Sequence, residues 1–221
     1  MDKLTEFITS EYGSPTAYSP LSTEELTALP SSLPAELSHL YREFGRFTLQ
    51  SGRLQVCHPH DLKGVLSVAL GGDRDFNEGN CHAFAYSAFG TVYFYQDIYG
   101  CGDLDLIEGQ LHSAPFTSNQ EPQNPGNTVF LPFLMDDDSL DYYDTEDRPL
   151  FSRARRKLGA LDIDECYGFV PAISLGGEPR MENLRKLKAR EHFSILSQSQ
   201  DIQLIGSSGY GESAKIRRIG A

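Results

Sequence analysis

The sequence predicts an α+β protein, in which helices pack against an antiparallel or mixed sheet and a mainly helical C-terminal part follows. Its 221 residues are 39% hydrophobic and 11% aromatic, which is enough to build a core and excludes a largely disordered chain. Segment 83–98 contains two aromatic and β-branched runs on either side of Gly90, a pattern typical of a hairpin. Apolar residues at helical spacing in 37–44 and 150–158 indicate that helices flank this hairpin.

Residues 1–115 are expected to form the first domain, an α+β unit. Gly13 and Pro15 exclude a long helix at its start. Ser22 and Glu25 stand three residues apart, as in a capping box, and predict that a helix begins there. The further elements expected in this domain are helices at 34–44 and 61–70 and strands at 53–57, 83–89, 92–98 and 103–107.

Residues 116–129 are rich in proline, serine, asparagine and glutamine and are expected to link two domains. The second domain, 130–205, is expected to be mainly helical. The elements expected in it are helices at 150–158 and 182–199 and a short apolar strand within 167–175. The last residues, 206–221, are small and polar and then basic, and they predict a flexible tail. A linker of this length allows the two parts to share one core.

Charge is distributed unevenly along the chain, whose net charge is −12. Residues 75–147 contain 14 acidic residues and no lysine or arginine. Residues 1–74 carry 9 acidic and 6 basic residues, and residues 148–221 carry 8 acidic and 13 basic residues. The acidic balance argues against binding to nucleic acid or to an anionic membrane, because phosphate contacts need lysine and arginine. It fits a basic protein partner or simple solubility.

Half of those 14 acids lie in segment 136–147, which is the strongest candidate for a binding site. Closely spaced acidic residues create a negative electrostatic potential that steers a basic partner toward them. Tyrosines beside charged residues are typical of interface anchors. We therefore predict a protein-docking surface, against the alternative of a solvated loop or a helix start. The residues of this surface are Asp136, Asp137, Asp138, Asp141, Tyr142, Tyr143, Asp144, Glu146 and Asp147.

A metal-regulated protein is one alternative, since Asp136, Asp138 and Asp141 have the oxygen density of a cation loop. The segment lacks the turn glycine and the final glutamate of a Ca²⁺ loop, and no phosphate-binding motif accompanies it. Two segments with cysteine and histidine, 57–60 and 81–82, offer zinc-type ligands, but their spacing matches no standard zinc pattern. No metal or other cofactor is therefore expected.

No set of residues at a recognisable spacing points to catalysis. The 4 cysteines and 6 histidines stand in no known nucleophile setting, and no GxSxG elbow occurs. We therefore expect that the protein is not an enzyme. The alternative is a small enzyme or ligand-binding module with a pocket lined by the aromatic hairpin 83–98.

The compartment expected from these patterns is the cytosol. The cysteines are widely spaced without a CxxC pair, which favours reduced and mostly buried thiols. The first residues contain no apolar stretch of signal-peptide length. No run of 18 apolar residues occurs, so no membrane span is expected.

Two stretches of the chain resemble known domains. The first stretch consists of Leu33-Pro34-Ala35-Glu36-Leu37, Phe44-Gly45 and Phe89-Gly90-Thr91-Val92-Tyr93. The second and denser stretch consists of Leu150-Phe151, residues 156–161, residues 164–172, Leu175-Gly176-Gly177, Glu182-Asn183-Leu184 and Glu191-His192. The first is similar to the GAD-like domain. The second is similar to the uncharacterised C-terminal domain that follows GAD-like domains in type VI secretion immunity proteins.

The resemblance covers residues 1–205 and implies a bacterial, cytoplasmic immunity protein that binds a co-encoded nuclease (DNase) effector. It supplies no catalytic residues. A nuclease must present a cationic surface to hold DNA, and a dense acidic face can occupy that surface or steer to it. We therefore expect segment 136–147 to make much of the contact. If Arg153, Arg155 and Arg156 fold back onto those acids, the toxin-facing surface must lie elsewhere.

Overall fold

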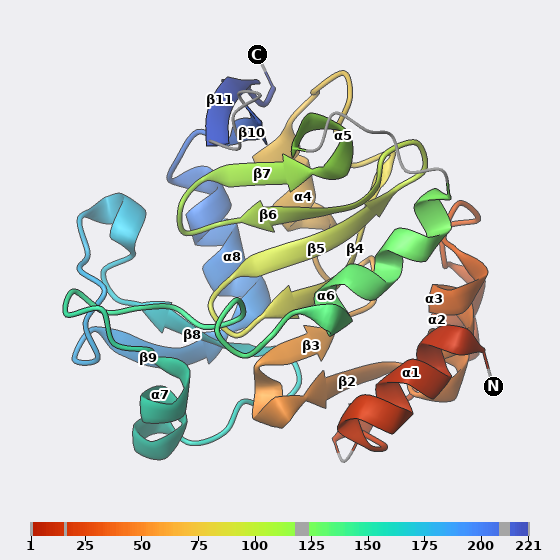
Figure 1. The fold of residues 1–221 in the computed structure, drawn as a ribbon, viewed down its shortest axis with the longest axis horizontal. Helices are drawn as coiled ribbons and strands as arrows, with labels where there is room; N and C mark the ends of the chain where they lie inside the picture. The colour runs from red at the N-terminus through yellow and green to blue at the C-terminus, as the bar shows by residue number, and fades with distance from the viewer. Residues whose placement is uncertain (1, 16, 118–123, 208–212, 221) are drawn as a thin grey trace.

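A computed structural model describes residues 2–15, 17–117, 124–207 and 213–220 and has the predicted α+β class. In these residues nine strands form one sheet in the order β1-β2-β3-β4-β5-β6-β7-β10-β11 (Figure 1). Neighbouring strands pair antiparallel, except that β10 is parallel to β7. The strands are β1 (Tyr18–Ser19), β2 (Arg46–Leu49), β3 (Leu54–Val56), β4 (Cys81–Ser87), β5 (Thr91–Gln96), β6 (Gly100–Asp105), β7 (Gln110–Ser113), β10 (Gln203–Ser207) and β11 (Ser213–Arg218).

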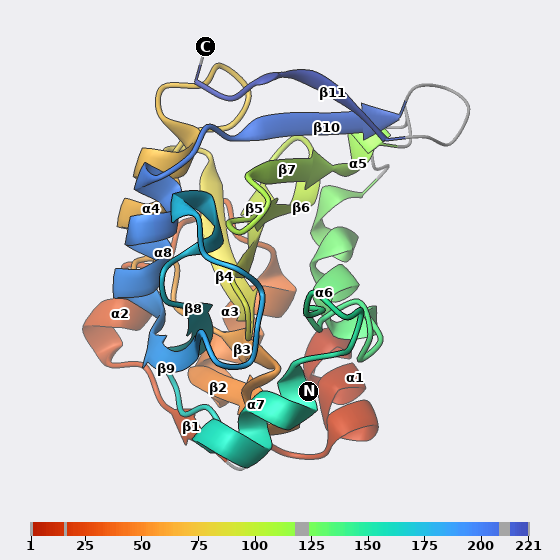
Figure 2. The same cartoon turned by 90° about the vertical axis from the view of Figure 1, so that its left-hand side faces the viewer.

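Helices cover both faces of this sheet, which is therefore the middle layer (Figure 2). One face carries α4 (Lys63–Leu70) and α8 (Ala189–Gln198), and the other carries α1 (Lys3–Tyr12), α3 (Ala35–Glu43) and α6 (Leu131–Leu134). The remaining helical segments are α2 (Thr23–Thr27), α5 (Ala114–Thr117), α7 (Phe151–Leu158), and the 3-10 turns η1 (Gln50–Gly52), η2 (Pro125–Phe130) and η3 (Ile173–Leu175).

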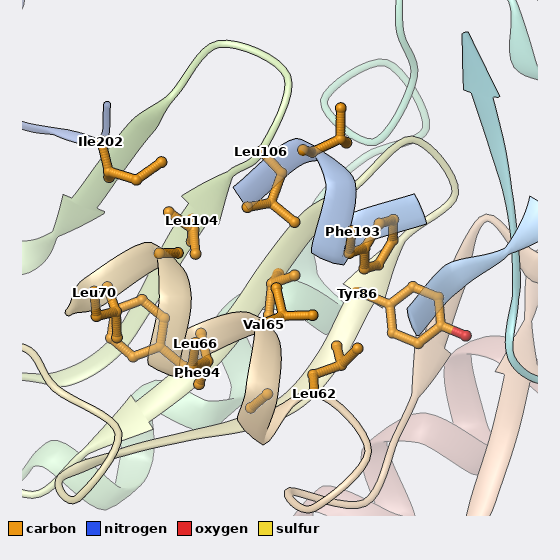
Figure 3. Close-up of a cluster of buried hydrophobic side chains, with 14 of the residues drawn as sticks. Leu62, Val65, Leu66, Leu70, Tyr86, Phe94, Leu104, Leu106, Phe193 and Ile202 are labelled. Carbon is orange, nitrogen blue, oxygen red and sulfur yellow. The ribbon is translucent and has the colours of Figure 1, made fainter. Parts of the chain in front are cut away.

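The hairpin expected at 83–98 is present as β4 and β5 in the centre of the sheet. Because helices cover both faces, its side chains are buried on both sides, which explains the continuous apolar run in the sequence. Tyr86 and Phe94 lie in the core beneath α4 and α8, where the ring of Phe193 meets Tyr86 edge-on (Figure 3). Phe84 and Tyr93 lie in the core on the opposite face.

The predicted capping box and the helix after Pro34 are both present. The Ser22 hydroxyl accepts a hydrogen bond from the Glu25 N–H at 3.2 Å, and the Glu25 carboxylate accepts one from the Ser22 N–H at 2.8 Å. Pro34 occupies the N-cap of α3. The local signals therefore place these two helix starts within a residue of their observed positions.

Helix α1 is an element that the sequence analysis does not predict. The Asp2 carboxylate caps its first turn by accepting hydrogen bonds from the N–H groups of Leu4 and Thr5. The helix ends at Gly13, whose φ of 75° suits glycine. Because Leu4 and Ile8 are fully buried against the sheet, packing stabilises a helix of only ten residues.

The helix predicted over 182–199 is wrong in its first half. Leu184–Lys188 is strand β9, which pairs antiparallel with β8 (Glu165–Phe169) in a separate two-stranded sheet. Leu184 and Leu187 are three residues apart, a spacing that a helix also allows. Pairing with β8 overrides this local pattern, because it places Leu187 opposite the buried Cys166.

The C-terminal part contains β8, β9 and β10 and is therefore not mainly helical. The expected flexible tail, 206–221, is also wrong where the structure describes it, because residues 213–218 form the edge strand β11. Arg217 of this strand donates to the Asp73 carboxylate, with 2.9 Å between Nη2 and Oδ1. Residues 208–212 of the expected tail lie outside the described residues.

The expected linker, 116–129, is described only in part, since residues 118–123 lie outside the described residues. Val129, near its end, is fully buried. One core joins both sides of the linker, because Leu66 and Phe94 lie in the same apolar cluster as Phe193. The division into two domains remains an interpretation of the sequence.

Candidate partner-binding surface

The acid-rich segment 136–147 connects α6 to α7 and is anchored at several points. Leu140 is buried in the core shared by α1, α3 and α6. The Asp136 carboxylate accepts a hydrogen bond from the Ser139 N–H at 2.8 Å, and the Asp138 carbonyl accepts one from the Asp141 N–H at 3.1 Å. The segment is therefore a tight turn held by the core rather than a freely solvated loop.

Arg53, which precedes β3, supplies a buried counter-charge to this turn. Its Nη1 donates to the Asp137 carbonyl oxygen at 2.7 Å and lies 3.2 Å from Asp141 Oδ2. Its Nη2 lies 3.4 Å from Asp137 Oδ2. The guanidinium also covers the ring of Phe151, 4.2 Å from the ring centroid. Nothing in the sequence near Arg53 indicates this role, since its partners follow more than 80 residues later.

The carboxylate of Asp141 binds backbone N–H groups at the start of α7. Its Oδ1 accepts hydrogen bonds from the N–H groups of Tyr142, Leu150 and Phe151, at 2.8, 3.0 and 2.7 Å. The first N–H groups of a helix have no intrahelical partner, and a carboxylate at this end also suits the helix dipole. Asp141 therefore caps the helix and pairs with Arg53, and its carboxylate is not free to contact a partner.

Asp144 is the second internal acid, and only 3% of its side chain is exposed. Its Oδ2 accepts hydrogen bonds from Arg148 Nη2 at 2.9 Å and from Arg153 Nη1 at 2.6 Å. Its Oδ1 accepts from the N–H groups of Glu146 and Arg148. The hydrogen bonds from Arg148, together with those from Arg153 and the backbone, hold the pKa of Asp144 well below its ordinary value and outweigh its burial.

The two tyrosines of the segment are not free anchors. Tyr142 donates its hydroxyl hydrogen to Glu108 Oε1 at 2.7 Å, and its ring packs against two phenylalanines of the core next to β8. Tyr143 donates to the Asp138 carboxylate, which raises the pKa of Tyr143 to about 12. Both rings are half-buried, so they stabilise the segment rather than stand out from it.

The structure thus divides the predicted site into internal and external residues. The acids that remain exposed are Asp136, Asp137, Asp138, Glu146 and Asp147. Of the three α7 arginines expected to fold back onto the acids, Arg153 pairs with Asp144, whereas Arg155 and Arg156 are exposed. The exposed acids of the segment therefore form two groups along the chain, one before and one after the buried Asp144.

Two apolar residues beside the first of these parts were missed by the sequence analysis. Leu131 and Leu134 of α6 are exposed, whereas Val129 and Phe133 are fully buried. The run Phe130–Leu134 is apolar throughout, so composition alone does not distinguish its two sides. The signal that could have found them is their spacing of three residues, which places both on one side of a helix.

A separate pocket of about 470 Å³ lies along the turn at residues 58–60 and the start of β4. Its lining includes His58, His60, Cys81 and His82, so the fold does bring together the two segments with zinc-type ligands. His58 is buried and satisfied, because its Nδ1 accepts from the His60 N–H at 3.1 Å and its Nε2 lies 3.2 Å from the Glu25 carbonyl oxygen. The lining of this pocket reaches β4 at Cys81 and His82 but includes no residue of the aromatic hairpin 83–98.

Burial governs the protonation of Cys81, His58 and His82, which line this pocket. Within the part of the chain that the structure describes, no group of three or more histidine, cysteine, aspartate or glutamate side chains is placed to hold a metal ion. All four cysteines are free and buried, and burial raises the pKa of the Cys81 thiol to about 12. Burial also lowers the pKa of His58 and of His82, so both imidazoles are neutral at pH 7.

Among the described residues, no helix is both long and apolar enough to cross a bilayer. The candidate binding features of the described surface are the divided acidic segment, the apolar pair on α6 and the pocket at residues 58–60.

Comparisons with known proteins agree with the order of domains expected from the sequence. The model of the GAD-like domain matches residues 3–103, and the model of the C-terminal part of the type VI secretion immunity protein Tdi1 matches residues 128–199. The crystal structure of Atu4351 from Agrobacterium tumefaciens is similar over 98% of both chains, with a TM-score of 0.86 and 23% sequence identity, and so shares the fold. No curated protein matches the sequence. The chain therefore carries a GAD-like domain followed by a domain of the type found at the C-terminus of the type VI secretion immunity protein Tdi1.

Proposed function

We propose that this protein binds a co-encoded type VI nuclease effector, a DNase, in the bacterial cytoplasm and neutralises it without catalysing a reaction itself. The observation that carries the proposal is the match of residues 128–199 to an immunity-protein domain. The exposed acids at the end of α6 support it, because they offer a negatively charged surface to a cationic protein.

The mechanism follows from the charge that a DNase needs. A protein that grips DNA neutralises phosphates with lysine and arginine, and its active face is therefore positive. An acidic protein that covers this face excludes the DNA, and the attraction between the two charges speeds the encounter. The exposed Asp136, Asp137 and Asp138 at the end of α6 offer such an acidic surface on this chain.

The experiment is to mix the purified protein with the co-encoded effector and measure DNA cleavage and the Kd. We expect stoichiometric loss of cleavage and a Kd that rises with salt, because screening weakens attraction between exposed charges. A matched acidic protein of similar size, without these domains, is the control. Undiminished cleavage at a threefold excess of this protein would contradict the proposed function.

A further inference from the structure

We infer that the effector docks on a patch formed by the apolar side of α6 and the exposed acids around its C-terminal end, which we name the α6 patch. Its residues are Glu11, Leu131, Leu134, Asp136, Asp137 and Asp138. The inference rests on the proposed function and deepens it, because it places apolar anchors at the centre of the contact and leaves Glu146 and Asp147 outside it.

The first observation is the exposure of two leucines on one side of α6. Leu131 is 48% exposed and Leu134 is 60% exposed, while Phe133 between them is fully buried. Figure 2 shows α6 on the outside of the sheet layer, and the exposure of the two leucines shows that their side of the helix faces away from the core. Single exposed leucines are common on protein surfaces. Two exposed leucines on the same side of a helix, beside charged residues, resemble the apolar centre of a protein–protein interface with its polar rim.

The second observation is that the helix is held firmly in place. The Tyr12 hydroxyl donates to the Phe133 carbonyl oxygen at 2.5 Å, and the Tyr93 hydroxyl lies 3.1 Å from Met135 Sδ. Just before the helix, the Thr128 hydroxyl oxygen accepts a hydrogen bond from the Cys101 N–H at 2.6 Å. Anchors that are already ordered lose little conformational entropy when a partner binds, which favours a tight contact at this place.

The third observation is the charge beside the leucines. Asp136, Asp137 and Asp138 follow α6 directly and are exposed. Of these, Asp137 pairs with Arg53, but 69% of its side chain still contacts solvent. The exposed Glu11 adds a fourth acid, because it precedes Tyr12, whose hydroxyl donates to the Phe133 carbonyl oxygen of α6.

The occupant that fits this surface is the cationic, DNA-gripping face of the effector. Arginine and lysine side chains of such a face pair with the four acids, and their long apolar stems, or an aromatic residue among them, cover the leucines. Other leucine-size residues are as exposed, with Leu175 at 60% and Ile195 at 51%. Neither is followed by a run of three acids, so they serve as matched controls.

The experiment measures the Kd between the catalytically inactivated effector and variants of the full chain. Leu131→Lys with Leu134→Lys places two positive charges in the patch, and we expect the Kd to rise by about 100-fold or more, the loss of two strong anchors. The control, Leu175→Lys with Ile195→Lys, adds the same charge elsewhere and is expected to change the Kd by less than about threefold. Asp136→Asn with Asp138→Asn should flatten the salt dependence, whereas Glu146→Gln with Asp147→Asn should not.

Folding and assembly are checked on the same variants. Circular dichroism and thermal unfolding verify that both double lysine variants are folded. If wild-type protein binds and the α6 variants bind equally well, the patch is wrong while the proposed function stands. If wild-type protein neither binds nor inhibits the effector, the proposed function itself fails. If the α6 substitutions convert a dimer of this chain into a monomer, the patch is an interface between two copies, and the inference is overturned.

Discussion

Asp141 and Asp144 stand in the same acidic run as Asp136 and Asp147, but their carboxylates have different surroundings. Asp144 accepts hydrogen bonds from Arg148 and Arg153, whereas Asp136 and Asp147 are exposed. This run of like charges therefore contains acids that are paired inside the fold and acids that face solvent. The buried, paired acids stabilise the fold, and the exposed ones are accessible to a partner.

At this scale we predict that Asp144→Asn lowers the Tm by a few degrees at pH 7, since it leaves two arginines without their shared carboxylate. The pKa of Asp144 is lowered in the folded state, so its contribution is complete above the unfolded pKa, about 4. It is lost as the pH falls through the folded pKa. The Tm difference between wild type and variant should therefore shrink below about pH 4.

Calorimetry from pH 3 to 7 measures this difference. The control is Asp147→Asn, which changes an exposed acid whose φ of 56° is also suitable for asparagine. Equal Tm values for the two variants at pH 7 would show that the Asp144 pairing does not stabilise the fold.

Among the elements, β8 and α8 pack so closely that one position of the strand requires glycine. Gly168 of β8 lies opposite Arg185 of β9, and its Cα faces the ring of the buried His192 on α8. A Cβ at residue 168 would overlap that ring. Glycine is needed here for the close approach of α8 to β8, rather than for an unusual backbone conformation.

We therefore predict that Gly168→Ala destabilises the protein by about 1–3 kcal/mol through overpacking. Urea unfolding followed by circular dichroism measures this change. The control is Gly72→Ala, because a Cβ at residue 72 meets no atom within 4 Å. An equal free energy of unfolding for the two variants would contradict the proposed close packing of His192 on β8.

In the molecule as a whole, the two regions matched by the family models contribute side chains to one hydrophobic core. Phe193, from the region matched by the Tdi1 model, packs on Tyr86 and lies in one cluster with Leu66 and Phe94 from the GAD-like region. The parallel pairing of β10 with β7 also extends the first region's sheet with a C-terminal strand. A core shared in this way favours cooperative unfolding.

We predict that Phe193→Ala lowers the free energy of unfolding by about 3–5 kcal/mol and leaves a single transition. Far-ultraviolet circular dichroism and tyrosine fluorescence should report the same midpoint in urea. Ile195→Ala, on the exposed side of α8, is the control and should change stability little. Two separate midpoints, with only one of them shifted by Phe193→Ala, would show that the two regions unfold independently.

The sequence by itself determined the fold class, several element positions and the uneven charge, because each depends on residues close together in the chain. The capping box at Ser22, the helix after Pro34 and the central hairpin result from such local patterns. The tertiary structure alone decided that Arg53 neutralises Asp141, that residues 184–188 and 213–218 become strands, and which acids stay exposed. The physical reason is that burial and pairing depend on distant groups that only the fold brings together.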